Sequence, residues 1–83
     1  MTEAEPSDAD VVRASLDEPA DFAELWHRHA PDLHRFVTRR LGPSAADDVA
    51  AETFEIAFRN RHRFDLSRTS ARPWLYGIAA NLI

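Results

Sequence analysis

Apolar side chains recur at steps of three and four residues in three segments of this 83-residue chain. This spacing places them on one face of an α-helix, and no segment shows the apolar–polar alternation of a half-buried strand. The three segments are residues 21–41, 44–61 and 70–83. Because short connections join them, the sequence predicts an all-α fold, a small antiparallel three-helix bundle.

The first predicted helix, residues 21–41, contains a proline within its apolar pattern. A proline ring removes one backbone donor and clashes with the preceding turn, so we expect a kink near Pro31 or a break near Ala30. Gly42 and Pro43 form the usual glycine-then-proline stop and should end this helix.

Residues 1–20 differ in composition from the rest of the chain. They are rich in Asp, Glu, Ala, Ser and Pro and lack aromatic residues, so they bury too little surface to offset the entropy lost on ordering. We therefore predict a mostly disordered acidic tail followed by a folded domain at 21–83. Val11, Val12 and Leu16 could form one short helical turn against that domain.

The net charge of −4 is distributed unevenly. Residues 1–24 hold eight acidic residues against Arg13, whereas residues 25–83 hold nine arginines against six acidic residues. The whole-chain charge argues against binding to nucleic acid, but the predicted domain by itself is basic and remains a candidate.

Several classes of protein are disfavoured by what the sequence lacks. There is no cysteine, so neither a disulfide nor a thiolate metal site is expected. There is also no long apolar run and no signal-peptide pattern, which favours a cytoplasmic protein without a membrane segment.

Catalysis and metal binding have little support. The two glycines, Gly42 and Gly77, make no phosphate-binding loop, and no serine or threonine lies near an obvious base. His27 and His29 would point about 200° apart on a helix and could not chelate one ion together. We therefore expect no enzyme, no metal and no cofactor.

The second predicted helix has an acidic face. Asp48, Glu52 and Glu55 follow one another at steps of four and three, so they share one exposed side. Such a face is either plain solvated surface or a site for a basic partner, and the pattern leaves both open.

Arginines are concentrated around the predicted loop at residues 64–72. Five of them fall within 14 residues, and Phe64 lies between them. This arrangement is either a solvated charge run or a track for a phosphate backbone with an aromatic side chain inside it. In the third helix, Trp74 is expected in the core, while Tyr76 points elsewhere and either stacks on bases or lies on the surface.

Three stretches in order resemble the helical domain of bacterial sigma factors of the extracytoplasmic-function (ECF) class. Residues 22–41 resemble the first helix of that family, and the sequence DDVAAETF at residues 47–54 resembles its signature helix. The sequence PWLYGIAAN at residues 73–81 resembles its Trp-Leu-x-x-Ile-Ala-x-Asn helix. The resemblance covers residues 20–83.

The resemblance implies two partners. The first is core RNA polymerase, where the β′ clamp helices would bind the signature helix, through Asp48, Glu52, Glu55 and Phe54 in this chain. The second is promoter DNA, where the loop and the third helix would capture a flipped base of the −10 element on the non-template single strand. The residues implied for DNA are Arg61, Arg63, Phe64, Arg68, Arg72, Tyr76 and Asn81. An anti-sigma factor is a further partner implied by the family.

The chain also departs from the family pattern. Ala51 stands where the family usually has Gln, and Asp47 replaces the commoner Glu. The third helix stops at Ile83, before the family's basic stretch and its helix-turn-helix domain, so a chain truncated at its C-terminus is expected. The alternative function is a helical protein–protein interaction module, a sigma-like adaptor without a DNA role.

Overall fold

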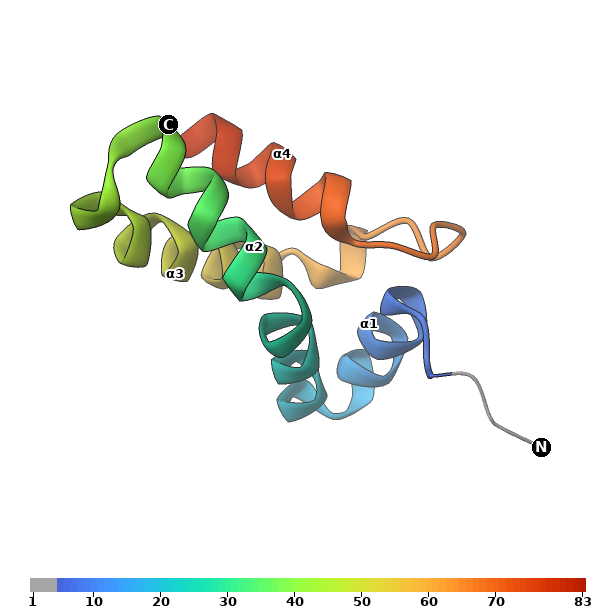
Figure 1. The fold of residues 1–83 in the computed structure, drawn as a ribbon. Coiled ribbons are helices and arrows are strands. Elements are labelled where there is room, and N and C mark those ends of the chain that lie inside the picture. Colours follow the sequence, from blue (N-terminus) through green and yellow to red (C-terminus); the bar gives the residue numbers. More distant parts are fainter. Residues whose placement is uncertain (1–4) are drawn as a thin grey trace.

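The computed structural model describes residues 5–83. This range consists of helices and the loops that connect them, and it contains no strand (Figure 1). The prediction of an all-α helical bundle is confirmed. Four α-helices are present instead of three: α1 (Asp8–Asp17), α2 (Ala23–Leu41), α3 (Pro43–Arg59) and α4 (Arg72–Leu82). Short 3-10 turns at Pro19–Phe22 and Arg61–Arg63 lie between them.

The three expected helices form the main bundle, in which α3 packs against both α2 and α4. Their apolar stripes meet between them, because each helix turns its residues at three- and four-residue steps inward. The side chains that are fully or almost fully buried there are Leu25, Leu33, Val37, Ala46, Ala50, Phe54, Ala57, Leu75 and Ala79.

The helix α2 continues through its internal proline. Pro31 lies inside a single helix of 19 residues, so the alternative of a break near Ala30 is wrong. In Figure 1 the direction of α2 changes between its teal first part and its green second part, as expected of a proline kink.

The connection from α2 to α3 is the predicted glycine stop. Gly42 has a φ of 86° and a ψ of 166°, and its N–H donates to the Thr38 carbonyl at 2.8 Å. A positive φ with this ψ is accessible almost only to glycine, so Gly42 allows α3 to start at Pro43 directly after α2 ends.

The helix α1 differs from the predicted disordered tail. Ser7 caps it in a capping box with Asp10, and Val12 is fully buried against the bundle. The composition rule failed here because it counts apolar residues and takes no account of polar anchoring, which Asp8 provides in this helix. Residues 1–4 of the predicted tail lie outside the described range.

Within the described range, no helix has both the length and the apolar character needed to cross a membrane.

Candidate functional site

The acidic face of α3 is exposed as predicted. Asp48, Glu52 and Glu55 all lie at the surface. None of the salt bridges found among residues 5–83 involves these three carboxylates, so they stay available to a cationic partner. The neighbouring Asp47 differs, because it lies 2.8 Å from the His34 ring nitrogen.

Phe54, the aromatic residue expected beside this face, is a core residue that is 7% exposed. It packs edge-on against Trp26, with ring centroids 4.8 Å apart. Trp26 is 41% exposed, so it is the aromatic side chain that a partner could touch here. The spacing of apolar residues in 21–41 places Trp26 on the same face as its neighbours, so it gives no sign that this side chain is exposed.

The loop between α3 and α4 forms a pocket of about 380 Å³ beside a pair of aromatic rings. Phe64 and Trp74 pack with their centroids 5.0 Å apart, Phe64 being buried and Trp74 half-buried. The lining residues are Arg63, Phe64, Asp65, Arg68, Ser70, Pro73 and Trp74. An aromatic wall with two arginines suits an unpaired base and its phosphate.

Short hydrogen bonds order this loop from within. The Asp65 carboxylate accepts from the Ser67 hydroxyl at 2.7 Å and from the Ser67 N–H at 3.0 Å. These two bonds lower the pKa of Asp65, so the carboxylate stays charged at lower pH than an ordinary aspartate does. The Arg68 side chain is 73% exposed and reaches Asp65 only at 3.8 Å, which leaves its guanidinium able to meet a phosphate.

The helix α1 braces both ends of the same loop. The buried Asp8 carboxylate accepts from the Ala71 N–H at 2.7 Å, and the Asp8 N–H donates to the Thr69 carbonyl at 3.1 Å. At the other end, Arg61 donates to the Ser15 carbonyl at 3.2 Å. The position of α1 therefore helps to set the shape of the pocket.

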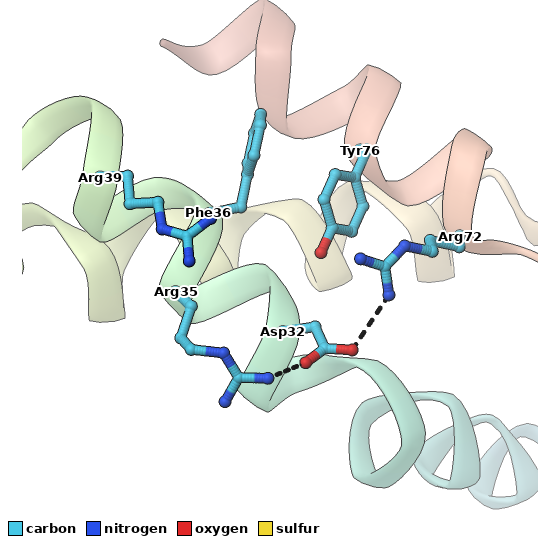
Figure 2. A pocket seen from close by; sticks show the side chains of 6 residues that line it. All are labelled: Asp32, Arg35, Phe36, Arg39, Arg72 and Tyr76. Atoms are coloured by element: carbon cyan, nitrogen blue, oxygen red, sulfur yellow. Dashed lines mark hydrogen bonds and ion pairs between the residues drawn. The ribbon is translucent and has the colours of Figure 1, made fainter.

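The residues implied for DNA do not all meet at one place. Arg63, Phe64 and Arg68 line the loop pocket, whereas Arg72 and Tyr76 line a separate cleft between α2 and α4 (Figure 2). Asn81 is exposed and lies about 7.5 Å further along α4 than Tyr76, given the helical rise per residue.

The Arg61 side chain is bound to the protein itself. Its guanidinium donates to the Phe58 carbonyl at 3.0 Å as well as to Ser15, and it stacks over the Phe58 ring at 4.1 Å. Three such contacts hold the side chain against the protein, so it is poorly placed to follow a DNA backbone.

No group of three or more His, Cys, Asp or Glu side chains in residues 5–83 is arranged to hold a metal ion. His29 and His34 instead contact Asp8 and Asp47, each at 2.8 Å.

The family model of sigma-70 region 2 matches residues 25–83. The chain belongs to this family. The match includes α3 with its acidic face, the arginine-rich loop and α4, and leaves α1 outside.

Two curated sigma factors are similar to this region 2 chain. It is 34% identical over 72 residues to the ECF RNA polymerase sigma factor RpoE of Cereibacter sphaeroides. This alignment covers 86% of the chain and 39% of that relative. It is 39% identical over 61 residues to the RNA polymerase sigma factor CarQ of Myxococcus xanthus, covering 72% of the chain and 34% of CarQ. The chain thus spans between one third and two fifths of the length of these relatives. No solved structure matches it significantly.

Proposed function

We propose that this chain is the part of an ECF sigma factor that binds core RNA polymerase and recognises and melts the promoter −10 element. The observation that carries the proposal is the sigma-70 region 2 match over residues 25–83, which takes in both candidate surfaces. As a factor that acts with RNA polymerase, it would work in the cytoplasm.

The polymerase surface of this proposal is the exposed face of α3. Asp48, Glu52 and Glu55 supply a strip of exposed negative charge with no salt bridge to residues 5–83, which suits arginines on a partner helix such as the β′ clamp helices. Trp26 supplies a half-exposed aromatic side chain, the type that often anchors an interface. Phe54 supports Trp26 from below and makes little direct contact in this arrangement.

The DNA surface is the loop pocket. A base that has left the duplex would stack beside Trp74, while Arg63 and Arg68 hold the flanking phosphates. Extruding a base costs a few kcal/mol, so the domain has only to trap the opened non-template strand and performs no covalent chemistry.

The decisive experiment exchanges charge on the α3 face. Glu52→Arg should abolish capture of purified core polymerase while leaving the helical circular dichroism spectrum unchanged. Asp17→Arg makes the same charge change at an exposed position on α1 and should capture polymerase normally. Undiminished capture by Glu52→Arg would rule out this face. Capture of polymerase without any affinity for single-stranded DNA would favour a protein-binding adaptor instead.

A further inference from the structure

A second cleft lies between α2 and α4, away from the loop pocket. It has a volume of about 300 Å³ and opens between the two helices (Figure 2). Trp74 and Tyr76 point about 200° apart around α4, so the two hollows lie on opposite sides of this helix. The lining residues of the cleft are Asp32, Arg35, Phe36 and Arg39 from α2, and Arg72 and Tyr76 from α4.

The cleft is positively charged and has an aromatic wall. Three guanidinium groups face one carboxylate, which leaves an excess of positive charge. The rings of Phe36 and Tyr76 pack with centroids 4.8 Å apart, and the Arg72 guanidinium lies 4.7 Å from the centre of the Tyr76 ring. Cationic groups beside an aromatic wall match the phosphate and the flat base of a nucleotide.

Asp32 occupies the place on Arg72 that an anion would take. It accepts a hydrogen bond from Arg72 at 3.0 Å and a second one from Arg35. The bond from Arg72 lowers the pKa of Asp32, so the carboxylate stays charged and competes with other anions. Figure 2 shows the Arg72 guanidinium and the Tyr76 hydroxyl pointing into the same space.

Arg39 is the arginine of the cleft that lacks a carboxylate partner among residues 5–83, since Arg35 and Arg72 both pair with Asp32. It is exposed and lines the opposite end of the cleft from Arg72. Arg39 and Arg72 both have long, flexible side chains, so a phosphate that replaces Asp32 on Arg72 would gain a second cationic contact once Arg39 turns toward it.

We propose that the cleft between α2 and α4 is a second nucleotide site, in which Arg39 and Arg72 bind a phosphate and Tyr76 lies beside the sugar or base. Asp32 competes with the phosphate for Arg72 and so weakens binding. If the phosphate is part of a DNA strand, this second site extends the proposed DNA function and rests on it. A free nucleotide presents the same chemistry.

The test measures binding of a fluorescent oligothymidylate to the full chain. Arg39→Gln should weaken binding about fivefold at roughly 0.1 M salt and reduce the salt slope by about 0.7, as expected for one single-strand phosphate contact. Asp32→Asn should strengthen binding, because the competing charge is gone. Arg13→Gln and Asp17→Asn repeat these charge changes on α1, outside the cleft, and control for long-range effects.

The opposite directions of the two cleft variants separate binding from folding. Loss of the exposed Asp32–Arg72 pair adds no contact to the protein. Binding by Asp32→Asn that is tighter than binding by Asp17→Asn therefore points to the arginines that Asp32 had occupied. If both cleft variants behave like their controls, the second site is wrong. In that case, weaker binding by Arg68→Gln, in the loop pocket, would leave the proposed DNA function standing. If Arg68→Gln also has no effect, both the second site and the proposed DNA function are wrong.

A parallel titration with thymidine 5′-monophosphate identifies the source of the phosphate. If the wild type binds the mononucleotide and Arg39→Gln does not, the result would support the site and assign it to free nucleotides. An Arg39 effect confined to the oligonucleotide would support it and assign it to a DNA strand. The absence of an Arg39 effect with both probes would overturn the inference.

Discussion

The Asp8 carboxylate accepts a hydrogen bond of 2.7 Å from the Ala71 N–H and thereby joins the start of the first helix to the start of the last. The same carboxylate lies 2.8 Å from the His29 ring nitrogen and 3.2 Å from the Arg28 guanidinium, both on α2. One buried side chain therefore links three helices. It lies outside the segment matched by the family model, although it holds the end of the candidate DNA loop.

Replacing this carboxylate should destabilise the protein strongly. Asp8→Ala leaves the Ala71 N–H and the Arg28 guanidinium without their acceptor, which should cost about 2–3 kcal/mol of the free energy of unfolding. Urea unfolding followed by circular dichroism measures the loss. Asp17→Ala removes an exposed carboxylate from the same helix and should change stability by less than about 0.5 kcal/mol. A similarly small effect in Asp8→Ala would mean that α1 is not docked in solution.

Stability should depend on pH through the same residue. Burial raises the pKa of Asp8, but the hydrogen bonds from Ala71, His29 and Arg28 outweigh it and hold the pKa below its ordinary value. A folded-state pKa below the unfolded value of about 3.9 means that the ionised group stabilises the protein above that pH. This stabilisation is lost as the pH falls through the folded-state pKa.

The measurement is the difference in unfolding free energy between wild type and Asp8→Asn as a function of pH. The difference should shrink as the pH falls below about 4, because the charge of Asp8 is then lost in the wild type. Asp32 and Asp65 also have lowered pKa values, through bonds from Arg72 and Ser67, but both proteins contain them and their effects cancel. A difference that stays constant far into acid would assign the stabilisation to something other than the Asp8 charge.

The sequence predicted those parts of the fold that depend on neighbours in the chain. Helical periodicity and the stop at Gly42 are local, and both appear where expected. The docking of α1 depends on a contact between Asp8 and Ala71, which are 63 positions apart, and no composition rule contains that information. An acidic, polar segment is predicted to be disordered, but hydrogen bonds from buried donors to one of its carboxylates can order it.

The candidate site shows the same limit. Counting arginines around the loop located the basic surface but could not separate Arg61, whose guanidinium stacks on Phe58, from Arg68, which is exposed. Spacing on α4 showed that Trp74 and Tyr76 point apart. It could not show that Tyr76 meets α2 and lines a different hollow from Phe64, because that depends on the packing of two helices.

The two glycines should respond to alanine in opposite directions. Gly42→Ala forces a side chain into a positive-φ conformation and should cost about 1–3 kcal/mol. An added Cβ there meets no atom of residues 5–83 within 4 Å, so the cost comes from the backbone alone. Gly77→Ala, inside α4 and equally unobstructed, should stabilise the protein by about 0.5–1 kcal/mol. Thermal unfolding of both variants checks the signs. A stabilising Gly42→Ala would contradict the positive φ described for Gly42, and a destabilising Gly77→Ala would contradict the prediction for α4.

Arg68 and Asn81 should affect DNA binding in different ways. Arg68→Gln removes an exposed cation beside the loop pocket, so binding should weaken equally on −10 and scrambled single strands, and the salt slope should fall by about 0.7. Asn81→Ala removes a side chain that can pair with base edges, so its loss should be larger on the −10 strand. Fluorescence anisotropy with both strands at several salt concentrations distinguishes the two patterns. An equal loss on both strands in Asn81→Ala would count against base recognition by α4, and would leave the exposed arginines as the source of affinity.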